Sequence, residues 1–328
     1  MRPAFLTILC MAAFAISCGK PAGGGAVRFR LAAGSTRAAF SGETGSDGVE
    51  RIDWEKGDRI RIASPQAFRA DDPACHFADY RVEKVRTDGS SSFATVTPDG
   101  PAPLLWGEGD HDFHAVFPAP DSGENILDDS YFQGFIPDTQ SLSWDGREGL
   151  PDKHFLYLVA AAEGVETEQT VSLPFRPAFT AVSFSLSLDD ANPVPLSAFR
   201  LESEGGPLAG SFRMGWTGNA VPETGDDASS VIRIPLDRTL EKDRPVTFTV
   251  LCLPVALSGL KAVFETGYGT KTLNLSYSDG TPVTFPARTL ARISGLVLPG
   301  APDITFTIGL VPWEEAREEA ETDGPITE

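Results

Sequence analysis

Residues 182–188 read Val-Ser-Phe-Ser-Leu-Ser-Leu, and this stretch decides the class of fold. Large apolar residues alternate with serine, so every second side chain of an extended chain points to the same face. The alternation predicts a β-strand that buries its apolar face and turns its serines toward solvent. Residues 246–250, Val-Thr-Phe-Thr-Val, repeat the pattern with threonine in place of serine and predict a second strand of the same kind.

The period of two extends over much of the chain. Apolar residues alternate with arginine at 27–31 and again at 59–62, and each stretch predicts a strand with one buried face. Residues 155–162 form a continuous apolar run, which predicts a central strand covered on both faces. Turn sequences punctuate these strands at Pro98-Asp99-Gly100, Asp145-Gly146, Gly205-Gly206-Pro207 and Ser278-Asp279-Gly280. Because helical periodicity is almost missing, the sequence predicts an all-β protein of antiparallel sandwiches.

The N-terminus carries the pattern of an exported lipoprotein. Arg2 precedes an apolar stretch from Ala4 to Ile16, and small residues then lead to Cys18. The stretch suits a signal peptide and is shorter than the roughly 20 residues that a membrane-spanning helix needs. We expect cleavage after residue 17 and lipidation of the Cys18 thiol, with acyl chains that hold the protein at a membrane. The alternative is an ordinary secretory signal that happens to contain a cysteine.

Length and composition set the domain organisation and exclude one class of partner. After residues 1–17, the sequence predicts a tether over 18–26, β-sandwich domains over 27–172 and 173–301, and a terminal strand with an acidic tail over 302–328. The net charge of −19 argues against nucleic acid as a partner, since a polyanion would be repelled. It also argues against an anionic lipid surface, which leaves the acyl group as the expected membrane link.

Few residues suggest chemistry. Asp110-His111-Asp112-Phe113-His114 has the residue types of a metal site, but no third ligand follows at a recognisable spacing, so we interpret it as a polar entry to a strand. Cys75 and His76 are neighbours whose side chains would diverge on a strand. No nucleophile elbow or phosphate-binding loop occurs. We therefore expect no enzyme activity, no cofactor and no metal.

The remaining polar and aromatic residues are interpreted as structural. Cys252 alternates in phase with buried residues and should itself be buried, and we do not expect it to form a disulfide with Cys75. The acidic segments 188–192 and 225–227 could hold calcium but lack an EF-hand spacing, which favours solvated turns. The tryptophans are scattered and should be core or corner residues rather than a stacking platform for sugars: Trp54, Trp106, Trp144, Trp216 and Trp313.

Seven segments resemble the fimbrillin family, the lipoprotein-derived subunits and anchors of pili in Bacteroidales-type bacteria, and they occur in that family's order. These segments are 35–42, 52–60, 113–118, 136–140, 171–179, 208–210, and the pair 285–288 and 293–299. The resemblance covers nearly the whole mature chain. The chain departs from the family at His114 and Phe117, where tyrosines are frequent, and it lacks an acidic run directly after Cys18.

The resemblance implies two tandem transthyretin-like Greek-key β-sandwich domains and a structural role. The chain would be a subunit or anchor of a cell-surface fimbria that assembles with other subunits by strand addition and is held in the outer membrane by its N-terminal lipid. Family shaft subunits lose their first strand to an arginine-specific protease, and Arg37 is the best-placed cleavage site, although an anchor would leave it uncut. Arg51 suits cleavage less, because Ile52 and Trp54 resemble the entry to a strand.

The segment 304–313 is the candidate donor strand for a neighbouring subunit. Its apolar row consists of Ile304, Phe306, Ile308 and Leu310, and it follows Pro299-Gly300-Ala301-Pro302, whose prolines interrupt a ladder of hydrogen bonds. The same row could instead complete the protein's own sandwich. A rival function of a different class is a surface adhesin or glycan-binding lipoprotein, which would contact a host or bacterial surface ligand through its loops.

Overall fold

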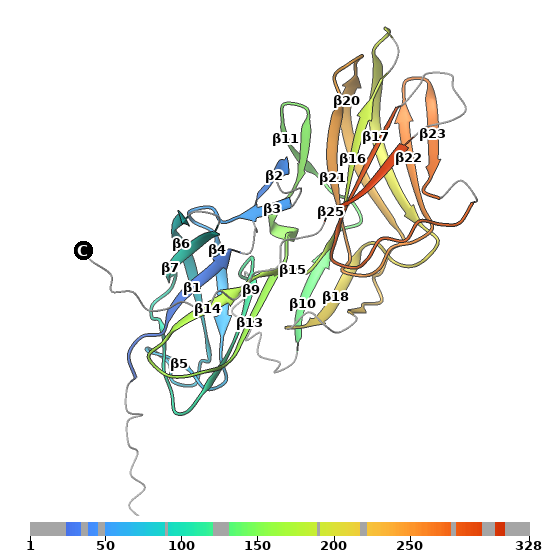
Figure 1. Ribbon diagram of the computed structural model, residues 1–328. Coiled ribbons are helices and arrows are strands. Elements are labelled where there is room, and N and C mark those ends of the chain that lie inside the picture. Colours follow the sequence, from blue (N-terminus) through green and yellow to red (C-terminus); the bar gives the residue numbers. More distant parts are fainter. Residues whose placement is uncertain are drawn as a thin grey trace, which may run out of the picture.

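The computed structural model describes residues 24–33, 39–44, 50–88, 91–120, 131–188, 191–216, 222–276, 280–296 and 306–311 (Figure 1). Within these ranges the regular elements are β-strands, apart from one short 3-10 turn, η1 (Lys153–Phe155). The prediction of an all-β protein is confirmed. Among the described residues, no helix is long and apolar enough to cross a membrane.

One group of strands forms an eight-stranded sheet. Its order is β14 (Thr170–Pro174), β1 (Arg28–Ala33), β7 (Ser91–Pro98), β6 (Phe77–Asp88), β4 (Arg59–Ala63), β9 (His111–Phe117), β13 (Leu158–Val165) and β15 (Arg176–Pro177). Neighbours run antiparallel except β1 and β14, which are parallel. Two small pairs accompany the sheet, β2 (Ala39–Thr44) with β3 (Glu50–Asp53) and β5 (Phe68–Arg69) with β8 (Leu104–Leu105).

A second group forms a β-sandwich of two sheets. The six-stranded sheet has the order β11 (Leu142–Asp145), β12 (Glu148–Pro151), β21 (Val246–Cys252), β16 (Thr180–Ser187), β24 (Leu290–Leu296) and β25 (Phe306–Val311). The four-stranded sheet has the order β20 (Val231–Leu240), β17 (Val194–Ser203), β22 (Leu260–Thr266) and β23 (Gly269–Asn274). Phe184 of β16 lies 4.8 Å from Phe199 of β17, measured between ring centroids, so the two sheets pack face to face.

The strand predicted at 182–188 is confirmed in detail. Val182, Phe184 and Leu186 are buried between the sheets, whereas Ser183 and Ser185 on the opposite face are half-buried. The stretch 246–250 also forms a strand, but Thr249 is buried, so both faces of β21 are largely covered. β12 and Gln140 pair with one edge of β21, and β16 pairs with the other.

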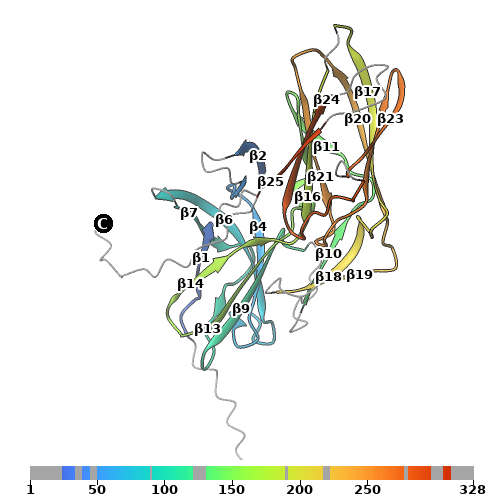
Figure 2. The same cartoon turned by 45° about the vertical axis from the view of Figure 1, so that its right-hand side comes forward.

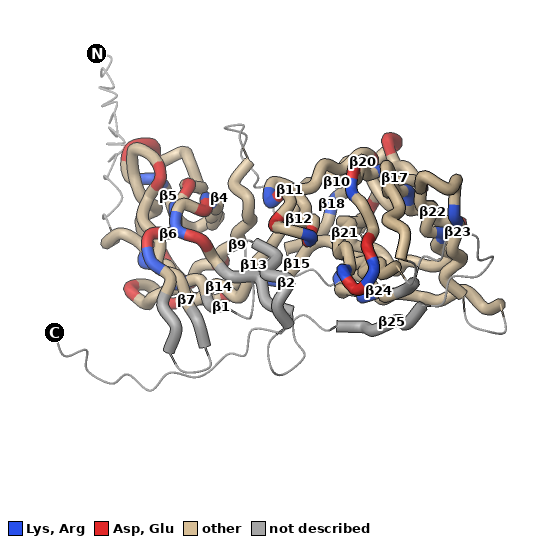
Figure 3. The backbone as a smooth tube through the Cα atoms, turned by 90° about the horizontal axis from the view of Figure 1, so that it is seen from above, with Lys and Arg blue, Asp and Glu red and all other residues tan. Residues whose placement is uncertain are grey.

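The segment between β9 and β13 leaves the first group and joins the second. β10 (Tyr131–Ile136) pairs with β18 (Gly210–Gly215), which in turn pairs with β19 (Glu223–Thr224), and β12 pairs with β21. In Figures 1 to 3 these strands lie between the two groups or against the second one. The domain boundary at residues 172 and 173 stays a prediction, and so do the Greek-key and tandem details of the fold.

The predicted central strand over 155–162 is wrong in its bounds. Asp152 accepts a hydrogen bond from the backbone N–H of His154 (3.0 Å), which caps η1, and β13 begins only at Leu158. Leu158, Val159 and Ala160 are buried, but the later part of β13 is partly exposed. The register shifts between Ala162 and Val165, where Gly164 has a φ of 64° and departs from the regular strand.

Gln140 joins the two sheets of the sandwich. Its side-chain Nε2 donates to the carbonyl oxygen of Leu251 (2.7 Å), and its Oε1 accepts from the backbone N–H of Leu251 (3.1 Å). Its own backbone N–H donates to the carbonyl oxygen of Arg233 in β20 (2.9 Å). The amide side chain therefore replaces a strand at the edge of β21, while the backbone pairs with the other sheet.

Replacing Gln140 with leucine should lower the free energy of unfolding by about 2–4 kcal/mol, because the buried N–H and C=O of Leu251 each lose a partner. Urea denaturation followed by tryptophan fluorescence measures this loss. Gln169→Leu is the matched control, since the Gln169 side chain is exposed and bonds only to Glu166. Equal stability of the two variants would contradict the role assigned to the Gln140 amide.

Candidate assembly strands and the other predicted residues

β1 is the first strand of the described chain, and it is paired on both sides. Its backbone runs parallel to β14, with Phe29 opposite Val171, and antiparallel to β7, with Leu31 opposite Ala94. Val27, Phe29 and Leu31 are buried, as their alternation with arginine predicts. An N-terminal strand thus occupies an interior position of the eight-stranded sheet.

Aromatic rings form the floor beneath β1. The Phe29 ring meets Tyr80 edge-on at 5.0 Å and Phe113 at 5.3 Å between centroids. The Tyr80 hydroxyl accepts a hydrogen bond from the backbone N–H of Leu104 (2.9 Å), and burial raises the pKa of Tyr80. Full burial of an aliphatic or aromatic side chain contributes roughly 1.5–3 kcal/mol, so the row on β1 contributes strongly to this part of the core.

The chain enters β1 through a close backbone contact. Gly24 lies so near Trp106 that an added Cβ would stand 2.6 Å from the Trp106 carbonyl oxygen. The Trp106 N–H donates to the Gly25 carbonyl oxygen (3.3 Å), and the Val27 N–H donates to the Leu104 carbonyl oxygen (2.9 Å). Only glycine fits this approach at position 24, and the hydrogen bonds fix the register of the strand that follows.

β25 lies at the other end of the chain and at the edge of the six-stranded sheet. It pairs antiparallel with β24, from Phe306 opposite Gly295 to Val311 opposite Leu290. Within the described residues its second edge has no partner strand. The strand predicted at 304–313 is confirmed over 306–311, which includes Phe306, Ile308 and Leu310.

Several predicted residues lie outside the described residues. These are Cys18 with the signal peptide, most of the tether, Arg37, Asp189 and Asp190 of the acidic segment 188–192, Ile304, Trp313 and the acidic tail. Arg37 stands between β1 and β2 in the sequence. Lipidation, cleavage and strand donation therefore stay predictions.

The residues of the candidate metal cluster take part in local hydrogen bonds and ring contacts. His111 is buried, its Nε2 accepts from the backbone N–H of Gly107 (2.9 Å), and its Nδ1 lies 2.8 Å from the Gly109 carbonyl oxygen. The Asp112 carboxylate accepts from the Gly164 N–H (2.8 Å), and the His114 ring stacks on Trp216 at 5.2 Å. No group of three or more His, Cys, Asp and Glu side chains placed to hold a metal occurs in the described part of the chain.

Cys75 and Cys252, the cysteines in the described part of the chain, are both buried free thiols. Cys252 is fully enclosed, as its phase with β21 predicts, and this burial raises the pKa of its thiol. His76 does not contact the Cys75 thiol through a hydrogen bond, because its Nδ1 lies 2.6 Å from the Ala67 carbonyl oxygen and the thiol bonds to the Phe77 carbonyl oxygen. The structure gives these neighbours separate partners.

The described tryptophans and the acidic segment 225–227 have structural contacts. Trp54, Trp106 and Trp216 are buried, and Trp144 packs under the guanidinium of Arg238 at 4.1 Å. The Asp227 carboxylate accepts hydrogen bonds from the backbone N–H and the hydroxyl of Ser211, which lowers its pKa. This confirms the interpretation of 225–227 as a turn, since the carboxylate is occupied by the chain itself.

Sequence reasoning missed a polar groove on the outer face of the six-stranded sheet. Its lining includes Glu148 from β12 and Arg292 from β24, which lie far apart in the sequence. The serine alternation at 182–188 indicated a polar sheet face. It gave no indication of the β11–β12 hairpin that forms one side of the groove.

Comparison with solved structures finds similar chains from Bacteroides and Porphyromonas species. A "putative cell adhesion protein" from Bacteroides ovatus is 16% identical, with a TM-score of 0.56 over 90% of this chain and 99% of that one. Another from Bacteroides uniformis is 13% identical, with a TM-score of 0.55 over 88% of this chain and 98% of that one. The tip fimbrial protein Mfa3 from Porphyromonas gingivalis, with a C-terminal truncation, is 10% identical at a TM-score of 0.44, with coverages of 88% and 100%.

The sequence itself matches no protein-family model and no curated protein. At these identities the comparison concerns the fold, and it spans almost the full length of both Bacteroides structures. The chain therefore has the fold of these two Bacteroides proteins.

Proposed function

We propose that this chain is a structural lipoprotein of a cell-surface fimbria, either a subunit or the anchor, which joins other subunits by strand addition. Cys18 carries the lipid that holds the protein in the outer membrane, and the protein performs no catalysis. The two Bacteroides proteins that share its fold are named as cell adhesion proteins, which supports a role at the cell surface. The resemblance of the sequence to the fimbrillin family supports the fimbrial one.

The position of β1 carries the proposal. A strand at the start of the chain lies between β14 and β7, with its apolar row in the core, and Arg37 follows it in the sequence before β2. Cleavage after Arg37 would separate β1 from the rest of the chain without cutting any described strand. The slot left by β1 would offer unpaired backbone on two sides and an apolar floor, the two features that bind an added strand.

The N-terminus of protein recovered from fibres tests whether this cleavage occurs. A shaft subunit should begin at Ala38, and an anchor should begin at a lipid-modified Cys18, both of which mass spectrometry of the N-terminal peptide identifies. A Cys18→Ala variant provides the control, since it should accumulate as uncleaved precursor without lipid. An N-terminus at neither position would contradict the proposed processing.

Truncation after Ala301 tests β25 as the donor. We expect a soluble, folded monomer that no longer enters fibres, because β25 is the edge strand of its sheet and, among the described strands, pairs with β24 alone. Fibre incorporation is measured by gel electrophoresis of unboiled samples, and folding by circular dichroism. A misfolded or insoluble product would show instead that β25 completes the protein's own core.

A further inference from the structure

We propose that the polar groove on the outer face of the six-stranded sheet binds a neutral carbohydrate. The groove has a volume of about 660 Å³, within the roughly 300–1,000 Å³ of small-molecule sites. Its lining is Asp145, Arg147, Glu148, Ser183, Ser185, Pro245, Thr247, Arg292, Ile293 and Ser294. The proposal concerns a ligand site and is independent of strand exchange, because its residues come from strands that such an exchange leaves in place.

Hydroxyl groups form the floor of the groove. Strand register places Thr247 opposite Ser185 and Ser185 opposite Ser294, so three hydroxyl-bearing residues cross three adjacent strands in one row. Ser183 lies two residues from Ser185, on the same face, opposite Arg292. The Thr247 hydroxyl donates to that of Ser185 (3.2 Å). Each hydroxyl can both donate and accept, as the hydroxyls of a sugar do.

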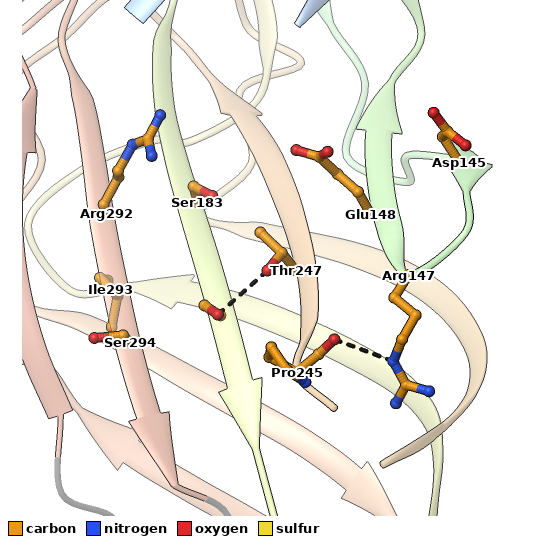
Figure 4. Close-up of a pocket in the computed structure, with 10 residues that line it drawn as sticks. Asp145, Arg147, Glu148, Ser183, Pro245, Thr247, Arg292, Ile293 and Ser294 are labelled. Carbon is orange, nitrogen blue, oxygen red and sulfur yellow. Dashed lines mark hydrogen bonds between the residues drawn. The ribbon is translucent and has the colours of Figure 1, made fainter. Parts of the chain in front are cut away.

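Opposite charges stand on the two sides of this floor. Figure 4 shows Glu148 on one side and Arg292 on the other, with Ser183 and Thr247 between them. Among the described residues, no hydrogen bond or salt bridge engages the Glu148 carboxylate. Burial raises the pKa of Glu148, and the charge of Arg292 opposes that rise. The Glu148 carboxylate has acceptors to offer, and a guanidinium carries several N–H donors, so a hydroxyl-bearing ligand can bond to both sides of the groove.

The β11–β12 hairpin, which carries Glu148, is held in place. Arg147, beside it in the β11–β12 turn, donates through Nε to the Pro245 carbonyl oxygen (3.1 Å) and through Nη2 to that of Arg244 (2.7 Å). It also pairs with Glu241 at 3.1 Å. Because Arg147 is committed to these contacts, the hairpin is fixed over β21, and the groove is formed before a ligand binds.

The charge distribution selects a neutral ligand. The lining carries two acidic side chains, Asp145 and Glu148, and two basic ones, Arg147 and Arg292, so its formal charges cancel, and a charged sugar would meet a like charge on one side or the other. A neutral saccharide avoids both repulsions while its hydroxyl groups donate to the carboxylate and accept from the guanidinium. No aromatic ring is found among the described residues that line the groove, which argues for weak binding.

Titration of the mature chain with oligosaccharides of different charge tests the proposal. The neutral probes are maltotriose, mannotriose and chitotriose, and the charged ones are trigalacturonate and the glucosamine trimer. We expect at least one neutral probe to bind with millimolar affinity by NMR chemical-shift titration and saturation transfer, and more tightly than both charged trimers. Failure of all three neutral probes, or tighter binding of a charged trimer, would overturn the proposal.

Variants then locate the binding. Glu148→Gln and Arg292→Gln should each weaken binding about tenfold or more, because each removes a charge-assisted hydrogen bond. Ser185→Tyr should fill the floor and abolish binding without lowering the unfolding temperature. Arg200→Gln and Glu202→Gln are matched controls, since this pair lies 3.7 Å apart on the outer face of the four-stranded sheet. Unchanged affinity in the groove variants would also overturn the proposal.

Discussion

Removing residues 18–37 is expected to prevent the eight-stranded sheet from folding stably. The deletion takes away Val27 and β1, and the buried Val27, Phe29 and Leu31 contribute roughly 5–9 kcal/mol if each adds about 1.5–3 kcal/mol. A whole domain is typically stable by only about 5–15 kcal/mol. Thermal unfolding by circular dichroism, together with size-exclusion chromatography, should show loss of the cooperative transition or aggregation through the exposed edges of β14 and β7.

The most specific test supplies the missing β1 as a separate peptide. A synthetic peptide of residues 24–33 should restore the cooperative transition, whereas the same peptide with Phe29→Asp should fail, because the charge cannot enter the floor formed by Tyr80 and Phe113. Deletion of residues 18–23 alone is the matched control and should leave the transition unchanged. A deletion of 18–37 that unfolds at the wild-type temperature would show that the sheet does not depend on β1.

Replacing Arg61 with alanine should lower the free energy of unfolding by about 3 kcal/mol, because it leaves the carboxylate of Asp79 without its main partner. Arg61 is 3% exposed. Its Nε donates to Asp79 at 2.6 Å, its Nη2 donates to Asp79 at 3.0 Å and to the Pro120 carbonyl oxygen at 3.2 Å, and its guanidinium covers the Phe77 ring at 4.7 Å. Chemical denaturation measures the effect.

Arg81 provides the matched control, because it also pairs with an aspartate at 2.6 Å but its side chain is 53% exposed. Arg81→Ala should cost less than about 1 kcal/mol, since solvent screens an exposed pair. The double variant Arg61→Leu with Asp79→Leu should recover much of the stability lost in Arg61→Ala, because it leaves no buried charge without a partner. Similar losses for Arg61→Ala and Arg81→Ala would contradict the burial argument.

Arg61 also shows where the sequence pattern misled. Alternation of Ile60 and Ile62 with arginines correctly predicts a strand, but the prediction of one solvated face is wrong at Arg61. The guanidinium is buried because Asp79 neutralises it and Phe77 covers it, and both come from β6, the neighbouring strand. An alternation pattern identifies a face of a strand, whereas the neighbour that covers this face depends on distant pairing.

The same distinction explains which parts of the candidate sites could be predicted. The strands of β1, β16 and β25 follow from local alternation, and so does the burial of Cys252. The insertion of β1 between β14 and β7, and the approach of Glu148 to the sheet that carries Arg292, depend on contacts between residues 59 or more positions apart. No short-range signal in the sequence encodes such pairings.

The path of the chain between its two groups of strands has a mechanical consequence. Counted over the described strands, the chain passes between the groups three times, from β9 to β10, from β12 to β13 and from β15 to β16. Tension that pulls the first group away from the second therefore acts on three covalent connections in parallel instead of on one linker. The β10–β18 ladder, paired from Tyr131 opposite Gly215 to Ile136 opposite Gly210, shares this load through its hydrogen bonds. A filament built from such units would resist stretching within each unit.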